Sequence, residues 1–240
     1  MVKSIVVDIG NTRIKAGVFE DGRLEQKFLL HDIDELGQRL SEPHDHVIVS
    51  SVREDAERAL TFSSARGKKI KLTSQTPLPI HFNYATPNTL GMDRIAAACG
   101  ALQLFPAENC LAIDMGTCIN YELVDREGNY WGGIISPGVD MRFESMHTFT
   151  ARLPLLQATA APELIGDSTM GCMQSGVMNG ILEEMKGIID RLKLKYPTLR
   201  VILCGGDAPL FENQLKPSIF AAPDLVLLGL NRILIHNATI

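Results

Sequence analysis

Two segments of the chain share one pattern, and this repetition constrains the fold more than any other feature. Residues Val7–Thr12 (VDIGNT) and residues Ile113–Thr117 (IDMGT) each follow an apolar run and lead into a second one. The second runs are Ile14–Phe19 and Ile119–Val124, and a polar turn follows each of them. Internal repetition is evidence about architecture, so the sequence predicts two copies of a strand–turn–strand unit in an α/β protein.

A strand that ends in Asp-x-Gly and folds back as a hairpin suits the phosphates of a nucleotide. The glycine lets the backbone approach closely, and hydroxyl, amide and N–H groups donate hydrogen bonds to phosphate oxygens. The aspartate can hold water around a magnesium ion. Ordinary turns would explain either segment alone, because Asp, Gly and Asn dominate turns. Their repetition favours two hairpins that grip a nucleoside triphosphate from both sides.

Composition narrows the class of protein. A chain of 240 residues with 45% hydrophobic and 21% charged residues can form one large or two small globular domains. A net charge of -5 and a pI near 5.7 argue against nucleic acid as a partner. We expect no membrane span, because no apolar stretch approaches about 20 residues. The odd number of cysteines and the absence of a CxxC pair predict buried free thiols and a cytoplasmic protein: Cys99, Cys110, Cys118, Cys172 and Cys204.

Hydrophobic periodicity predicts a mixed α/β order. In the first half we expect strands over residues 4–9, 14–19, 23–30, 47–50 and 70–72, helices over 32–40, 55–65 and 91–104, and a loop over 80–88. In the second half we expect strands up to 114 and over 119–124 and 200–204, a loop over 132–138, and helices over 141–150, 169–194, 209–213 and 225–236. The domain boundary is predicted between residues 88 and 110.

A third glycine-rich segment follows the predicted strand over residues 200–204. Gly205 and Gly206 would let an adenine or ribose lie against the backbone, although a tight strand-to-helix turn explains this segment equally well. Two phosphate hairpins followed by a Gly-Gly turn are typical of the actin-like ATPase and sugar kinase superfamily.

Within that superfamily the chain resembles the type III pantothenate kinases nearly from end to end. The matching segments are Asp8–Lys15, Ser50–Val52, Tyr84 and Pro87 with Gly91–Arg94, Asp114–Thr117, Gly132–Gly133, Pro137–Gly138, Leu153–Pro154, Thr169 with Gly176, Gly205–Ala208 and Leu225–Leu230. One segment departs: where the family commonly has Ala, Thr and Asp after the second phosphate motif, this chain has Cys118, Asn120 and Glu122.

The resemblance implies a fold and an activity. The fold is α/β, a duplicated actin-like ATPase (ribonuclease H-like) fold with two mixed-sheet domains, residues 1–100 and 101–240, around an ATP cleft. The activity is ATP-dependent phosphorylation of pantothenate to 4'-phosphopantothenate, the first step of coenzyme A biosynthesis. The alternatives are another small-molecule kinase of the superfamily, which the Gly91–Arg94 segment disfavours, and a non-catalytic regulatory protein, which Asp8 and Asp93 disfavour.

The resemblance also assigns residues to roles. The ATP-binding residues are Asp8, Ile9, Gly10, Asn11, Thr12, Arg13, Ile14, Lys15, Thr117, Gly205 and Gly206. The pantothenate-binding residues are Tyr84, Gly91, Met92, Asp93, Arg94 and, from the neighbouring subunit of a homodimer, Thr169. Asp8 would hold Mg²⁺ through water, and Asp114 would bind a monovalent cation, K⁺ or NH₄⁺.

Asp93 is the predicted general base. Without its context, an aspartate near the start of a helix caps the helix or favours its dipole. Between Gly91 and Arg94, in a chain with two phosphate hairpins, it becomes the carboxylate that accepts the proton of the attacking hydroxyl. The planar guanidinium of Arg94 could pair with a substrate carboxylate through two parallel donors.

Overall fold

The computed structural model describes residues 1–10, 13–53 and 56–239, which form two compact units. The first unit contains Met1–Ala107, Val124–Gly132 and the residues from Asp224 on, and the second contains Glu108–Leu123 and Gly133–Pro223. Each unit combines segments that are distant in the chain, so the division into domains 1–100 and 101–240 stays a prediction. None of the described helices combines the length and the apolar character needed to cross a membrane.

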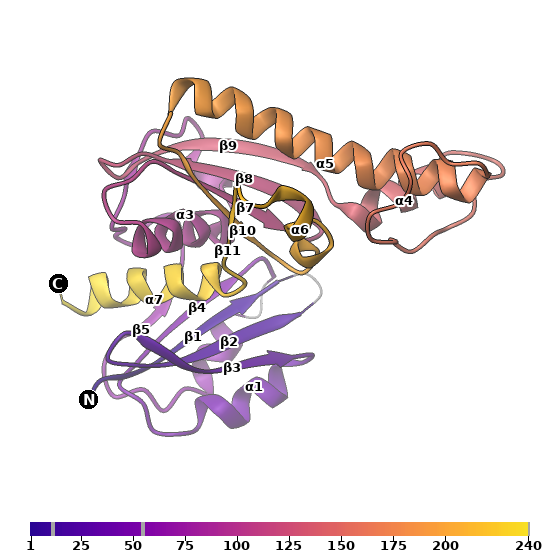
Figure 1. The fold of residues 1–240 in the computed structure, drawn as a ribbon. Helices are drawn as coiled ribbons and strands as arrows, with labels where there is room; N and C mark the ends of the chain where they lie inside the picture. Colours follow the sequence, from indigo (N-terminus) through magenta and orange to yellow (C-terminus); the bar gives the residue numbers. More distant parts are fainter. Residues whose placement is uncertain (11–12, 54–55, 240) are drawn as a thin grey trace. The chain divides into compact units, whose positions relative to one another are not determined.

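The first unit is built on a five-stranded sheet (Figure 1). Its elements are β1 (Lys3–Ile9), β2 (Ile14–Glu20), β3 (Arg23–Leu30), α1 (Ile33–Leu40), β4 (His46–Ser51), α2 (Ala56–Thr61), β5 (Lys69–Lys71), α3 (Met92–Leu104) and α7 (Leu225–Ala238). The strand order is β3-β2-β1-β4-β5; β1 and β2 pair antiparallel, as do β2 and β3, whereas β4 pairs parallel with β1 and β5. The predicted order β-β-β-α-β-α-β is confirmed.

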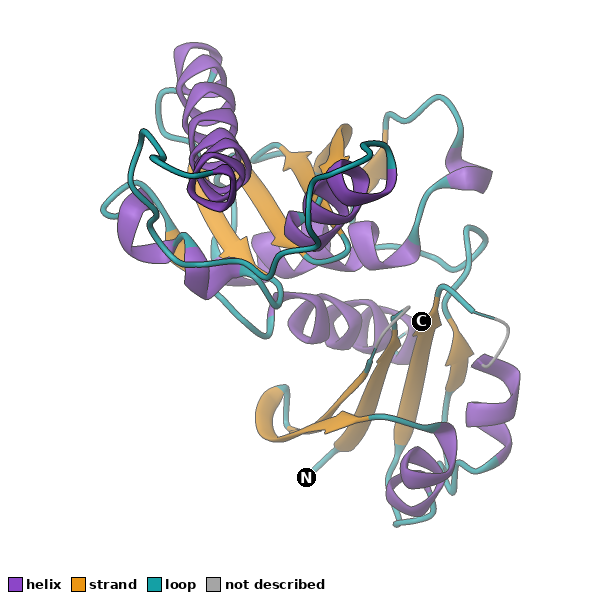
Figure 2. Cartoon of the chain, turned by 90° about the vertical axis from the view of Figure 1, so that its right-hand side faces the viewer, coloured by secondary structure: helices purple, strands orange, loops and turns teal. Residues whose placement is uncertain are grey.

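The side chains of each strand alternate between the two faces of this sheet, and each face is covered by different helices. Ile5, Val7 and Ile9 of β1 pack with Val47 and Val49 of β4 and with the apolar residues of α1 and α2. Successive side chains of a strand point to opposite faces. The intervening residues of β1 therefore face the other side, where α7 packs. Figure 2 shows helices on both sides of these strands.

Helices α3 and α7 pack against each other at very short range, although about 120 residues separate them in the chain. A Cβ atom added to Gly229 of α7 would overlap the carbonyl oxygen of Ala96 in α3, and one added to Gly100 of α3 would overlap the carbonyl oxygen of Leu225. Any side chain at either position would push the helices apart. The C-terminal helix is thus part of the core that the N-terminal residues form.

The second unit contains most of a six-stranded sheet with the order β11-β10-β7-β8-β9-β6. Its elements are β7 (Cys110–Met115), β8 (Cys118–Val124), β9 (Asn129–Pro137), α4 (Val139–Thr148), α5 (Thr169–Lys195), β10 (Arg200–Cys204), η2 (Ala208–Leu210), α6 (Glu212–Leu215) and β11 (Phe220–Ala221). The long helix α5 buries its predicted apolar stripe, including Met173, Val177, Ile181 and Met185, against the strands. The turn between β8 and β9 belongs to the first unit.

Five details differ from the sequence-based expectations. In place of the predicted helix over 209–213, the chain has the 3-10 turn η2 (Ala208–Leu210) followed by the short helix α6 (Glu212–Leu215). The predicted loop over residues 80–88 contains a short strand, β6 (His81–Phe82), and a 3-10 turn, η1 (Pro87–Thr89). The predicted loop over 132–138 is largely the end of strand β9. The predicted helix over 55–65 is described only as Ala56–Thr61. The predicted burial of all five cysteines is wrong for Cys172, which is exposed, and for Cys118, which is partly exposed, whereas Cys99, Cys110 and Cys204 are buried free thiols.

Candidate active site

The first phosphate motif lies at the end of β1, where the chain turns back into β2. The backbone N–H of Gly10 donates to the carbonyl of Arg13 at 3.0 Å and closes the turn. Asp8 is the register partner of Lys15 on β2, so these two predicted phosphate and magnesium residues are cross-strand neighbours on one face. Ile9 and Ile14 are buried in the core, where they anchor the hairpin rather than contact solvent. Asn11 and Thr12 lie outside the described residues.

The second phosphate motif is the turn between β7 and β8. The N–H of Gly116 donates to the carbonyl of Cys118 at 3.0 Å, and the N–H of Gly138 donates to the carbonyl of Thr117 at 3.1 Å. Thr117 itself is exposed, so its hydroxyl can reach a ligand. The turn is therefore held from the strand that follows it and from the segment after β9.

The Gly205-Gly206 turn packs directly against this second motif. Strands β10 and β7 pair in parallel with Cys204 opposite Asp114, and the N–H of Asp207 donates to the carbonyl of Met115 at 3.1 Å. Gly205 has φ +95°, and a Cβ atom there would lie 2.6 Å from Oδ1 of Asp114. A left-handed conformation with so close an approach requires glycine. The predicted cation ligand and the predicted nucleoside turn thus lie side by side.

Arg142 holds the segment that supports Thr117. Its Nε donates to the carbonyl of Pro137 at 2.9 Å, and its Nη2 donates to Oγ of Ser136 at 2.9 Å and to Glu184 of α5 at 2.7 Å. The buried Tyr121 donates to the other oxygen of Glu184 at 3.1 Å. Burial, the charge of Glu184 and this hydrogen bond all raise the pKa of Tyr121, so it stays a donor. No short sequence motif links residues so far apart in the chain, so this network is not predictable from the sequence.

The predicted general base lies at the first turn of α3. Gly91 is the N-cap, and Asp93 and Arg94 follow in the first helical turn. A Cβ atom added to Gly91 would overlap Oδ1 of Asp93, so a larger residue there would displace the carboxylate. Asp93 is half-buried, whereas Arg94 is only 7% exposed.

An aromatic ring, that of Tyr84, lies near Arg94. Its guanidinium carbon lies 6.0 Å from the ring centroid of Tyr84, at the outer limit for a cation–π contact. Tyr84 in turn packs against the buried Tyr130, with ring centroids 6.0 Å apart. The first unit thus brings Tyr84, Gly91, Asp93 and Arg94 close together, and their binding of pantothenate stays a prediction.

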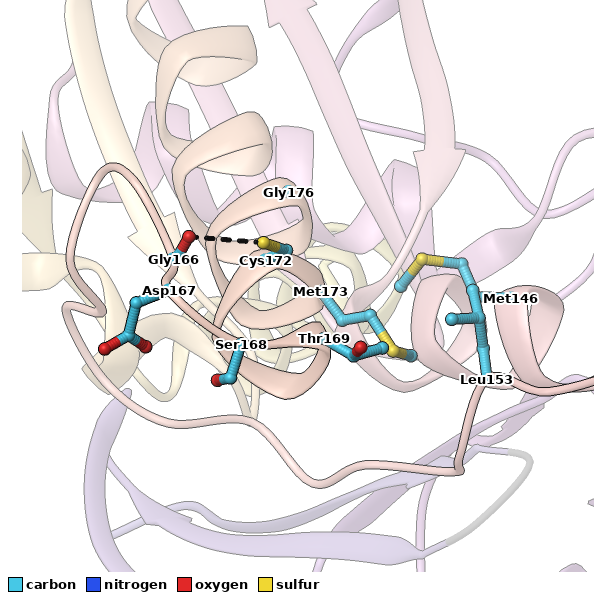
Figure 3. Close-up of a pocket in the computed structure, with 9 residues that line it drawn as sticks. All are labelled: Met146, Leu153, Gly166, Asp167, Ser168, Thr169, Cys172, Met173 and Gly176. Carbon is cyan, nitrogen blue, oxygen red and sulfur yellow. Dashed lines mark hydrogen bonds between the residues drawn. The ribbon is translucent and has the colours of Figure 1, made fainter.

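Thr169 is the exposed first residue of α5, in the second unit. It lines a pocket of about 590 Å³ with Met146, Leu153, Gly166, Asp167, Ser168, Cys172, Met173 and Gly176 (Figure 3). Ser168 caps the helix by accepting from the N–H of Gly171 at 3.2 Å, and the thiol of Cys172 donates to the carbonyl of Gly166 at 3.3 Å. Because Thr169 and Asp93 belong to different units, their meeting in one site stays a prediction.

The described residues hold no group of three or more His, Cys, Asp or Glu side chains that could ligate a metal ion. The chemistry near Asp8 nevertheless suits magnesium, which prefers oxygen donors, keeps several waters and needs few carboxylates. Asp8 has the hydroxyl of Ser50 as a cross-strand neighbour on β4. These oxygen donors fit a divalent ion that is bound through its waters. The three neighbouring residues Lys15, Asp8 and Ser50 include no sulfur ligand, which would favour a different metal.

Solved structures define the class of fold. A putative Baf family transcriptional activator from Campylobacter jejuni has a TM-score of 0.64 and 22% identity to the chain, covering 98% of this chain and 100% of that one. A putative N-acetylmannosamine kinase from Listeria monocytogenes has a TM-score of 0.56 and 14% identity, covering 98% and 99%. The Clostridium difficile activator of 2-hydroxyisocaproyl-CoA dehydratase, with bound ADPNP, has a TM-score of 0.57 and 11% identity, covering 99% and 96%. The chain therefore has the α/β fold of actin-like ATPases and sugar kinases.

Sequence relatives identify the family within that class. The model of the type III pantothenate kinase family matches residues 4–191. A type III pantothenate kinase of Cytophaga hutchinsonii is 44% identical over 237 residues, covering 98% of this chain and 99% of that protein. That of Christiangramia forsetii is 43% identical over 244 residues, with the same coverage. The chain belongs to the type III pantothenate kinase family.

Proposed function

We propose that the chain transfers the γ-phosphoryl group of ATP to the primary hydroxyl of pantothenate and forms 4'-phosphopantothenate, the first step of coenzyme A biosynthesis. The observation that carries the proposal is the cluster of Tyr84, Gly91, Asp93 and Arg94, in a chain that matches the family over nearly its full length. A carboxylate beside a largely buried guanidinium can take a proton from a hydroxyl while the guanidinium holds a substrate carboxylate. We place this reaction in the cytoplasm.

The residues divide the work of phosphoryl transfer between positioning and charge stabilisation. Asp93 accepts the proton of the attacking hydroxyl, and Arg94 pairs with the carboxylate of pantothenate. Lys15 and the backbone N–H groups of the first hairpin hold phosphate oxygens, as does Thr117 on the second hairpin. Asp8 would hold the waters of a Mg²⁺ ion, and that ion would supply charge neutralisation for the triphosphate.

Asp114 is proposed to bind a monovalent cation that balances phosphate charge. Its carboxylate lies against Gly205, in the turn proposed to hold the nucleoside. We expect higher activity in K⁺ or NH₄⁺ than in Na⁺ at matched ionic strength, because the larger ions shed water more readily. Equal rates in the three salts would contradict this role for Asp114. The variant Asp114→Asn, which removes the charge at nearly the same size, should lose the preference for K⁺ or NH₄⁺.

The chain is further proposed to act as a homodimer whose partner subunit supplies Thr169. Support comes from one open face of α5: Cβ atoms added at Gly176, Gly180 and Gly187 would meet no atom within 4 Å. Glycine inside a helix costs up to about 1 kcal/mol relative to alanine, so exposed glycines without a role in their own unit suit close approach by a second helix.

An ATP-consumption assay with and without pantothenate tests the activity itself. We expect pantothenate-dependent ADP release and a product heavier by one phosphoryl group. ATP turnover that ignores pantothenate but responds to another alcohol would favour a different small-molecule kinase. ATP binding without turnover on any substrate would favour a regulatory protein.

Subunit mixing tests the shared site. Asp93→Asn and Thr169→Ala chains are each expected to be inactive as homodimers, and a heterodimer would hold one site with both defects and one with neither. Activity should then partly return. The absence of recovery despite confirmed subunit exchange, or a monomer in light scattering, would refute the shared site. Gly180→Ala is a second probe, because it should stabilise an isolated helix yet weaken a close interface.

A further inference from the structure

Ser50 combines deep burial with an unsatisfied hydroxyl. It lies one residue before the end of β4, is 1% exposed, and its Oγ has no hydrogen-bond partner in the described part of the chain. Buried hydroxyl groups in native proteins almost always have a partner, whether a protein group, a water or an ion. An orphaned one therefore points to a partner outside the protein chain, such as a water or the hydration shell of an ion.

The register of the sheet shows where this hydroxyl belongs. Asp8 pairs with Ser50 on the parallel strand β4 and with Lys15 on the antiparallel strand β2. Residues in register project to the same face of a sheet. Lys15, Asp8 and Ser50 consequently form one row across three strands, with the carboxylate in the middle.

This row lies on the face away from α1 and α2. Those helices pack on Val7 and Val49, the neighbours of Asp8 and Ser50. The opposite face is the one that α7 covers: Gly17, the register partner of Val6, would place a Cβ atom 3.4 Å from Leu227. Ser50 is therefore buried at the β4 end of the row, beside Asp8, on the face of the sheet against which α7 packs.

We propose that Ser50 is a positioning residue for the divalent cation that accompanies ATP. Its hydroxyl donates to a water of hydration that Asp8 holds, and so fixes that water on the side of β4. The inference rests on the proposed role of Asp8. A magnesium ion keeps several of its waters when bound, so its outer partners decide how firmly it is held.

The energetics give a clear signature. Alanine at a site of an unsatisfied buried hydroxyl removes the desolvation cost of that group, so Ser50→Ala should keep or raise the melting temperature of the ligand-free protein. The same change should weaken ATP binding in the presence of Mg²⁺ by about twofold to tenfold, the typical worth of one hydrogen bond. In EDTA, Ser50→Ala and the natural chain should bind ATP equally.

The experiment is a set of calorimetric ATP titrations, with and without Mg²⁺, beside thermal unfolding of the ligand-free proteins. Ser51→Ala is the matched control, because the Oγ of Ser51 donates to the carbonyl of Arg53 at 2.7 Å and accepts from its N–H at 3.0 Å. It should lower stability slightly and leave the Mg²⁺ dependence unchanged. Ser50→Cys, with a weaker donor of similar size, should give an intermediate affinity.

Each alternative outcome has a defined meaning. Unchanged Mg²⁺-dependent affinity in Ser50→Ala overturns the proposal, as does an equal loss of affinity in EDTA, which would place the hydroxyl on the nucleotide itself. A clear drop in melting temperature for both Ser50→Ala and Ser50→Cys would show a structural hydroxyl and also overturns it. The Asp8→Asn variant distinguishes a failure of this inference from a failure of the proposed role of Asp8. If Asp8→Asn still binds ATP in a Mg²⁺-dependent way, the proposed role of Asp8 is wrong.

Discussion

The ion pair between Arg142 and Glu184 should make a measurable contribution to stability, because it links α4 with α5 behind the second phosphate motif. The pair has an N···O distance of 2.7 Å, and Glu184 also accepts from the buried Tyr121. Arg142→Met keeps the apolar stem of the side chain and removes the charge. Glu184→Gln keeps an acceptor for Tyr121 and removes the opposite charge. These two variants and their combination form a double-mutant cycle.

The exposure of the two side chains sets the magnitude. They are 21% and 28% exposed, between the fully solvated pairs worth up to about 1 kcal/mol and the buried pairs whose disruption costs about 3–5 kcal/mol. We expect a coupling energy of about 2 kcal/mol. For a chain of this length about 1 kcal/mol shifts the melting temperature by about 2–4 °C, so each single variant should lose about 4–8 °C.

Urea unfolding of the four proteins, followed by circular dichroism, measures the coupling, and steady-state kinetics measures the effect on the phosphate motif. Arg142→Met should also raise KM for ATP, since it frees the segment that donates to the carbonyl of Thr117. Additive losses, to within about 0.5 kcal/mol, would refute the network as an energetic unit. An unchanged KM for ATP would show that the Arg142–Glu184 ion pair does not affect nucleotide binding.

Three further predictions concern other parts of the chain. Asp93→Asn should fold and bind ATP but turn over roughly 100-fold or more slowly in the coupled assay, as loss of a general base typically costs; near-normal turnover would contradict the assignment. Burial lowers the pKa of His44 below 6.5, so the unfolded chain binds the extra proton first and stability should fall as the pH drops below about 6.5. His44→Gln should flatten that slope in urea unfolding between pH 7.5 and 5.5, and an unchanged slope would point to other groups. Gly205→Ala should lose about 1–2 kcal/mol from its left-handed backbone alone, and should displace Asp114 enough to weaken ATP binding in titrations; normal affinity would contradict that contact.

The elements that the sequence predicted correctly are those with strong local patterns. The strands β1, β2 and β10 and the helix α7 are each rich in apolar residues and bounded by polar residues or glycine. The repeated Asp-x-Gly motif located two strand–turn–strand hairpins, and the ordered family segments named Tyr84 and Arg94, which lie close together; phosphate binding at the two turns stays a prediction. Local chemistry and order along the chain were sufficient for these features.

The features that the sequence did not predict depend on partners distant in the chain. Strand β6 has only two residues and exists through its pairing with β9, where His81 lies opposite Asn129. Residues 132–137 contain adjacent glycines and a proline, which are typical of a loop, but pairing within the sheet extends them as a strand. The unsatisfied hydroxyl of Ser50 is visible only when burial and hydrogen bonding are known.

The interlocked glycines of α3 and α7 also bear on the order in which the chain can fold during synthesis. Residues 1–107 leave the ribosome first, but the face of their sheet that α7 covers stays open until Leu225–Ala238 has been made. The nascent N-terminal segment must therefore wait, with apolar residues such as Val6 and Ile48 unprotected, while the whole second unit is translated. A stop codon just before Leu225 would remove only the last helix. The unit that then lacks part of its core would be the N-terminal one, which is synthesised first.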